Sequence, residues 1–116
     1  MPHVILEHSN NVEDVINYQD FFKDLIDIML DLKIISDANT VKSRFIAAKE
    51  YYLHQENNIY IHLQLSLLAG RDKVKLQELG KKTKELMENI FTISYQKYKN
   101  SFSVEIREID GEIYQK

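Results

Sequence analysis

The chain has 116 residues, of which 44% are hydrophobic and 28% charged, so it fits one folded domain over residues 1–116 and excludes a disordered chain. Its 15 basic and 18 acidic residues give a net charge of −3, and without a basic cluster we expect no nucleic-acid partner. Because it has no cysteine, no secretory signal and no apolar run near the ~20 residues of a membrane span, we expect a cytoplasmic protein with no membrane partner.

The first half of the sequence predicts a strand, a helix and a second strand. Residues 2–7 are apolar and β-branched in the centre, and turn formers at residues 9–11 close this strand. Apolar residues then recur every three or four positions, which predicts a helix over residues 12–33. Residues 40–52 have no helix-capping signal and fit a second strand.

The second half repeats this order. Residues 59–68 alternate between apolar and polar side chains, which is typical of a strand with one buried face. A turn at residues 69–72 leads into a second helix, whose apolar stripe runs from Leu76 to Tyr95. Alternation returns at residues 102–107 and predicts the last strand.

The order β-α-β-β-α-β divides into two βαβ halves, and right-handed crossovers would make the two strands of each half parallel. Two helices can cover one face of four strands, which predicts an α+β fold, a two-layer sandwich with a mixed sheet. The polar side chains of the third strand must then meet solvent, a ligand or another subunit, and we expect an oligomer. They are Tyr60, His62, Gln64 and Ser66.

Pro2 is the first candidate for catalysis. Removal of Met1 would leave a secondary amine at the chain terminus, carried on a rigid ring. Such an amine titrates near ~7.7–8.0 in model peptides, and burial or neighbouring cations would lower its pKa toward neutrality. A base with that pKa suits proton transfer at neutral pH.

Three cations could converge near this amine. The two-residue period places Lys42 and Arg44 on the same face of the second strand, and Arg71 follows the third strand in a glycine-containing turn. A guanidinium can hold a carboxylate with two hydrogen bonds, which suits an acidic substrate. The alternative is that these cations form only surface salt bridges. His62 could bond a ligand or lie in a subunit contact.

The histidines give weak support for a metal site, because none are spaced four residues apart on a helix or clustered with carboxylates. They are His3, His8, His54 and His62. We therefore predict no metal. The sequence also has no nucleophile motif, phosphate loop or dinucleotide fingerprint.

Three stretches together resemble the 5-carboxymethyl-2-hydroxymuconate isomerase family of the tautomerase superfamily. They are the start Met-Pro-His-Val-Ile-Leu-Glu, the Lys-Ser-Arg of the second strand, and Tyr-Ile-His-Leu-Gln-Leu-Ser-Leu-Leu-Ala-Gly-Arg. The resemblance spans nearly the whole chain. It implies a tautomerase-like βαβ repeat, a homotrimer, a small carboxylate substrate and catalysis without a cofactor by the processed N-terminal proline.

Carried over to matching positions, the resemblance implies roles for five residues. Pro2 would move the proton of a dicarboxylic or tricarboxylic dienol acid and Arg71 would stabilise the dienolate, while Lys42, Arg44 and His62 would bind substrate. The family usually has Arg-Ser-Arg where this chain has Lys-Ser-Arg, and lysine lacks planar two-point recognition of a carboxylate. The C-terminal tail is also shorter than in the family, which affects the shape of the site.

Two other readings fit the sequence. The chain could be a non-catalytic trimer on the tautomerase scaffold that binds a small organic acid. The element order alone also permits a ferredoxin-like regulatory module that binds a ligand at a dimer interface.

Overall fold

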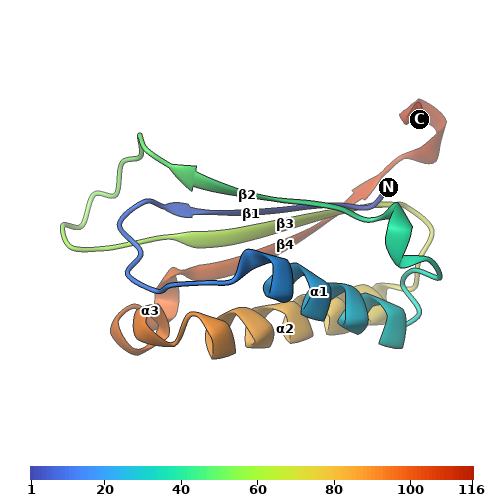
Figure 1. Ribbon diagram of the computed structural model, residues 1–116. Helices are drawn as coiled ribbons and strands as arrows, with labels where there is room; N and C mark the ends of the chain where they lie inside the picture. Colours follow the sequence, from blue (N-terminus) through green and yellow to red (C-terminus); the bar gives the residue numbers. More distant parts are fainter.

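The computed structural model describes residues 1–116 and contains one four-stranded sheet (Figure 1). The strands are β1 (His3–Ser9), β2 (Lys42–Ala48), β3 (Ile61–Leu68) and β4 (Phe102–Ile109). They lie in the order β2-β1-β3-β4, with β1 parallel to β2, β3 parallel to β4, and β1 antiparallel to β3. The prediction that the two strands of each half are parallel is confirmed.

Both long helices lie on the same side of the sheet, as Figure 1 shows. They are α1 (Tyr18–Asp31) and α2 (Lys73–Ile90). The short helix α3 (Thr92–Lys97) follows α2, and the 3₁₀ turns are η1 (Ala38–Thr40), η2 (Lys99–Ser101) and η3 (Gly111–Ile113). The predicted two-layer α+β fold is confirmed. None of the helices is both long and apolar enough to cross a membrane.

The core lies between the sheet and the two helices and follows the two-residue period of the strands. The fully buried side chains from the two central strands are Val4, Leu6, Ile61, Leu63 and Leu65. Those from the helices include Phe21, Leu25, Met29, Leu79 and Met87. The alternate residues of β1, which are His3, Ile5 and Glu7, are only partly buried and belong to the open face of the sheet. Each strand therefore presents one face to the core and one to the open side.

Helix α1 begins at Tyr18, later than the predicted start at residue 12. Asn17 caps the helix, because its side-chain oxygen accepts the backbone N–H of Asp20 at 3.1 Å. The residues between β1 and this cap have no helical structure. Their apolar spacing resembled a helix, but their backbone follows a different path.

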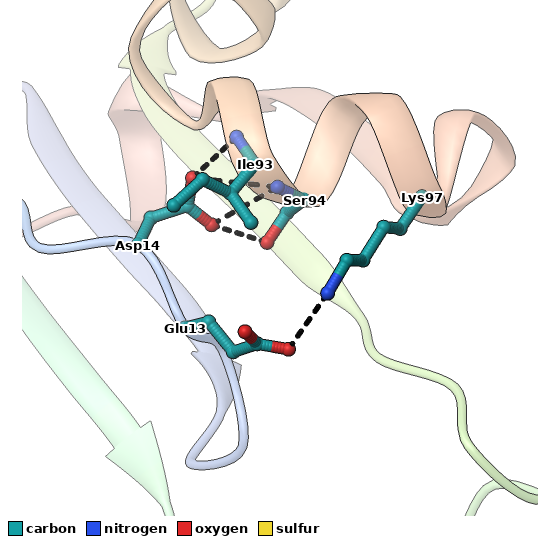
Figure 2. Close-up of polar contacts among 5 residues, drawn as sticks. All are labelled: Glu13, Asp14, Ile93, Ser94 and Lys97. Carbon is teal, nitrogen blue, oxygen red and sulfur yellow. Dashed lines mark hydrogen bonds and ion pairs between the residues drawn. The ribbon is translucent and has the colours of Figure 1, made fainter.

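Asp14, in this connection, caps a helix from the other half of the chain. Figure 2 shows its carboxylate against the first turn of α3, where it accepts the backbone N–H of Ile93 at 2.8 Å and that of Ser94 at 3.2 Å. The hydroxyl of Ser94 also donates to Asp14, and Lys97 pairs with Glu13 at 3.2 Å. Helix α3 has no capping side chain of its own, so Asp14 supplies the missing acceptor.

Strand β2 ends at Ala48, four residues before the predicted end at residue 52. Its partner β1 ends at Ser9, which pairs with Ala48, so the following residues have no neighbouring strand. They form an irregular connection that projects away from both chain termini (Figure 1). Tyr52 in this connection is 80% exposed.

Candidate active site

Pro2 is buried directly before β1, beside the start of β2. Its carbonyl oxygen accepts the backbone N–H of Lys42 at 3.0 Å, and the terminal ammonium of Met1 donates to the carbonyl of Thr40 at 3.1 Å. While Met1 is attached, the Pro2 nitrogen is an amide and has no basic lone pair. Removal of Met1 would make that nitrogen a terminal amine just before β1 and beside the start of β2.

Lys42 and Arg44 lie on one face of β2, as the sequence predicts. Lys42 pairs with His3 and Arg44 pairs with Ile5, so both cations share the open face with those residues of β1. The ammonium of Lys42 donates to the carbonyl of Asn39 at 3.3 Å. The guanidinium of Arg44 instead contacts the imidazole of His3 at 3.3 Å.

Arg71 follows β3 and is held by two backbone carbonyls. Its Nε donates to Ile34 at 3.0 Å and its Nη1 donates to Leu68 at 2.8 Å. Gly70 before it has a φ of +119°, a conformation that favours glycine and turns the chain toward α2. A guanidinium has five N–H donors, and two of them are used here, so three remain for a carboxylate.

Four of the predicted site residues lie at one end of the sheet. Strand β3 runs antiparallel to β1, so its last residues lie beside Pro2, and Arg71 follows at the same end of the sheet with its guanidinium bonded to Ile34 and Leu68. Lys42 and Arg44 come from the start of β2, which pairs in parallel with the start of β1. Each cation has its own partner, and no hydrogen bond joins any two of these four side chains.

His62 lies toward the other end of β3. It pairs with Glu7, whereas the register puts Pro2 opposite Leu67, five residues or roughly 17 Å further along the strand. The imidazole of His62 contacts the hydroxyl of Ser103 at 2.7 Å and the carboxylate of Glu105 at 3.5 Å. Substrate binding by His62 stays a prediction, since within one chain this residue is remote from Pro2.

The Ser103, His62 and Glu105 contacts have the composition of a nucleophile triad but lack its setting. The three side chains lie on the open face of the sheet, and none of them lines a cavity. A triad also needs donors converging on an oxyanion in a site that excludes water, and these exposed strand residues have no such site. These contacts therefore give no basis for hydrolytic chemistry.

A groove of about 710 Å³ runs between α1 and the outer strand β2. Aromatic rings from Tyr18, Phe22 and Phe45 line it, together with Asp20, Lys23 and part of Arg44, whose guanidinium lies at His3 on the open face. The rings and Lys23 suit an organic acid that carries a conjugated chain, whereas the carboxylate of Asp20 would repel it. Pro2 does not line this groove, but Val41, which does, precedes the residue bonded to Pro2.

His8 belongs to the core. One ring nitrogen donates to the carbonyl of Ser9 at 2.7 Å, the other accepts the hydroxyl of Tyr18 at 2.9 Å, and the ring lies 4.8 Å from that of Phe45. Burial is the main cause that lowers the pKa of His8, so it is neutral near pH 7. No group of three or more His, Cys, Asp or Glu side chains lies close enough together to hold a metal ion.

One contact at this end of the molecule could not be predicted from the sequence. The hydroxyl of Tyr114, in the C-terminal tail, lies 3.5 Å from His3 on the side opposite Arg44. Figure 1 shows both chain termini at this end of the sheet. The position of His3 directly after Pro2 is the one feature of the sequence that could have drawn attention to it. The contact with Tyr114 depends on the fold, which brings the C-terminal tail to His3.

Similar folds occur among solved structures. A 5-carboxymethyl-2-hydroxymuconate isomerase from Deinococcus radiodurans R1 has 23% identity and a TM-score of 0.83, with 99% of this chain and 87% of that chain covered. A 5-carboxymethyl-2-hydroxymuconate delta-isomerase has 15% identity and a TM-score of 0.69, with 100% and 87% covered. A macrophage migration inhibitory factor-like protein from Entamoeba histolytica has 12% identity and a TM-score of 0.72, with 99% and 94% covered. At these identities the likeness shows the fold, which is that of the tautomerases.

A sequence search of curated proteins finds no match. The sequence model of the 5-carboxymethyl-2-hydroxymuconate isomerase family, in contrast, matches residues 2–116. That match begins at Pro2 and includes every candidate site residue. The chain therefore belongs to the 5-carboxymethyl-2-hydroxymuconate isomerase family.

Proposed function

We propose that this chain interconverts the enol and keto forms of a small dicarboxylic or tricarboxylic dienol acid, with Pro2 as the base after removal of Met1. Family membership supports an isomerase or tautomerase. The observation that carries the proposal is the burial of Pro2 at the end of the sheet where Lys42 and Arg44 begin β2 and Arg71 follows β3.

The chemistry needs only proton transfer. The neutral amine of Pro2 takes the proton of the enol hydroxyl, and the electron pair of that O–H bond forms the carbonyl. The conjugated double bonds shift, and the ammonium returns the proton to a carbon further along the chain. No electron is gained or lost and no group leaves, so the reaction as proposed requires no cofactor.

Arg71 is proposed to stabilise the dienolate. Its guanidinium is fixed by the carbonyls of Ile34 and Leu68, so little side-chain freedom remains to be lost when an anion binds. Arg44 and Lys42 are proposed to bind the substrate carboxylates. Lysine at position 42 gives a single-point contact, whereas Arg44 can give two parallel hydrogen bonds.

We also propose that the chain works as a cytoplasmic homotrimer. The open face of the sheet carries half-buried polar side chains, and a subunit contact would cover them. In such an assembly His62 could reach a substrate bound at a neighbouring chain. Sedimentation equilibrium measures the subunit number, and a monomer would contradict this part of the proposal.

The decisive experiment joins mass spectrometry and an assay. The intact mass of the protein from its native host tells whether Met1 is present, and the processed and Met1-retaining forms are then compared in the ketonisation of 2-hydroxymuconate. Activity confined to the processed form is expected, because only that form has a basic Pro2 nitrogen. Equal activity of both forms would exclude Pro2 as the base.

A non-catalytic protein that binds a small organic acid is the second candidate. The contact of the Met1 ammonium with the carbonyl of Thr40 favours it, because it gives the unprocessed terminus a fixed position. Binding of a dicarboxylate by a protein that retains Met1 in its host, with no turnover, would support this candidate over the isomerase.

A further inference from the structure

Three side chains from distant parts of the sequence meet beside Pro2. His3 lies between Arg44 of β2 and Tyr114 of the C-terminal tail. Its Nδ1 is 3.3 Å from Nη1 of Arg44, and its Nε2 is 3.5 Å from the hydroxyl of Tyr114. The imidazole therefore joins the chain terminus that carries Pro2 to a cation proposed to bind substrate.

The direction of these hydrogen bonds follows from the chemistry of the groups. A guanidinium can only donate, so Nδ1 of His3 must carry a lone pair toward Arg44. The proton of the neutral ring is then on Nε2, which faces the oxygen of Tyr114. In this arrangement the guanidinium fixes the tautomer of the imidazole, and the imidazole holds the guanidinium in position.

The charges around His3 favour this neutral form. Its pKa is lowered, first by loss of solvent and then by the positive charges of Arg44, the N-terminus and Lys42. Tyr114 is the remaining titratable group in contact with it, and the neighbour across β3 is the uncharged Ser66. No carboxylate is in contact with His3, so nothing there stabilises an imidazolium.

The guanidinium of Arg44 has no other hydrogen-bond partner in the chain. Lys42, the nearer residue on β2, is bonded to the carbonyl of Asn39 and so does not hold His3. Arg44 uses one of its five donors on His3, which leaves four for a carboxylate. Without His3, the long side chain of Arg44 would be free to leave the site.

On the basis of the proposed function, we propose that His3 is a positioning residue, which holds the Arg44 guanidinium for the carboxylate of a small organic acid. Tyr114 orients the imidazole from the other side and thereby connects the C-terminal tail to the site. His3 itself transfers no proton in this scheme. It acts on substrate affinity through Arg44, because a cation already in place loses less side-chain entropy on binding.

The first test reads the contact without any assay. In ¹⁵N spectra of the wild type, the imidazole of His3 should carry its proton on Nε2. In Arg44→Gln the pKa of His3 should rise, because a repelling cation is gone, whereas Arg107→Gln on the outer strand β4 should leave it unchanged. An unchanged His3 titration in Arg44→Gln would overturn the proposal.

The second test uses kinetics of the processed protein with 2-hydroxymuconate. His3→Ala should raise KM about 3- to 10-fold, the loss expected for one hydrogen bond, and leave kcat within about twofold. His3→Asn should restore KM, because its amide oxygen lies where Nδ1 was. In an Arg44→Gln background, His3→Ala should have no further effect. An unchanged KM in His3→Ala, or an equal rise in both backgrounds, would overturn the inference.

Failure of the proposed function has a separate signature. If the processed wild type does not convert 2-hydroxymuconate, the same variants are compared by calorimetric binding of fumarate, a dicarboxylate that cannot tautomerise. Weaker binding in His3→Ala, recovery in His3→Asn and no further loss in the Arg44→Gln background would support positioning by His3. Equal fumarate affinity in all variants would overturn it. Thermal unfolding of each variant confirms that the folded state is compared.

Discussion

The two βαβ halves share one strand arrangement but carry opposite charges at corresponding positions. In the first half, His3 of β1 contacts Arg44 of the outer strand β2. In the second half, His62 of β3 contacts Glu105 of the outer strand β4. The two halves therefore share a scaffold but differ in charge. The residue that contacts the histidine is the cation Arg44 in the first half and the anion Glu105 in the second.

The grooves between helix and outer strand differ in the same way. The groove of the first half holds about 710 Å³ and is lined by aromatic rings of α1 and β2. The groove of the second half, between α2 and β4, holds about 460 Å³ and is rimmed by Lys73, Lys81 and Lys84. Flexible lysines on an open rim are ordinary helix-surface residues. Leu76, Val104 and Ile106 also line the second groove, so aromatic rings, rather than an apolar lining as such, distinguish the first groove.

The connections after the first strand of each half explain how the halves depend on each other. Eight residues, 10–17, join β1 to α1, whereas four residues, 69–72, join β3 to α2. The long connection is held by the cap from Asp14 to α3, and the short one by the two bonds of Arg71. Asp14 of the first half thus bonds to α3 of the second half, and Arg71 of the second half bonds to Ile34 of the first half.

The substitution with the largest expected effect is Arg71→Ala, which tests whether the candidate site needs a residue from the second half. Arg71→Ala should lower kcat/KM about 10²- to 10³-fold, the loss typical of a preorganised donor to a developing oxyanion. It should also lower the free energy of unfolding by about 1–3 kcal/mol, since the carbonyls of Ile34 and Leu68 lose their partner.

Steady-state kinetics and urea unfolding measure the two effects of Arg71→Ala separately. Arg71→Lys serves as the control, because it keeps the charge but not the two-point geometry. An alanine variant that is destabilised yet retains full kcat/KM would make Arg71 a structural residue only. The first half would then contain the whole site.

The next effect compares the two outer strands directly. Arg44→Gln should lower kcat/KM about 10- to 100-fold, mostly through KM, because a carboxylate loses a charged two-point partner. Arg107→Gln is matched in chemistry and lies on the open face of β4, where it pairs with Glu105 at 3.0 Å. Its kcat/KM should stay within about twofold. Similar losses in both variants would mean that the charge difference between the halves does not locate the site.

Much of the sheet could be predicted from the two-residue period of its strands and from the rules for βαβ units. The two-residue alternation gave the core faces of the strands and placed Lys42 and Arg44 together, and the structure confirms both. Crossover handedness gave the parallel pairs. These features depend on residues close in sequence or on rules that hold for any βαβ unit.

What the sequence could not give depends on contacts between distant segments. The spacing after β1 resembled a helix from residue 12, but Asp14 bonds to Ser94, 80 residues away, and Asn17 caps α1. The sequence predicts one helix with an apolar stripe to Tyr95, but α2 ends at Ile90 and Tyr95 lies in α3, because the backbone of Phe91 is not helical. The bond from Tyr114 to His3 spans 111 residues. No local pattern encodes such pairs.

A smaller effect tests the dependence between the halves. Asp14→Asn should lower the free energy of unfolding by about 1–2 kcal/mol, because both carboxylate oxygens accept from Ile93 and Ser94 and the amide has only one oxygen. Glu13→Gln removes the adjacent exposed ion pair with Lys97 and should change it by less than about 0.5 kcal/mol. Urea unfolding of both variants gives the comparison. Equal small losses would show that the cap on α3 does not stabilise the connection.

The smallest effect concerns a bond between the halves on the open face. The hydroxyl of Tyr60, just before β3, donates to Glu7 of β1 at 2.5 Å, and burial followed by this bond raises the pKa of Tyr60 to about 12. Because the folded pKa lies above the unfolded value of about 10, the stabilisation is complete below pH 10 and is lost as the pH rises from 10 to 12. Solvent screening limits it to about 1 kcal/mol or less. Tyr60→Phe should therefore be less stable than the wild type at pH 8, and the gap should close by pH 11.5 in urea unfolding. A gap that stays constant would mean that this bond contributes nothing to holding the halves together.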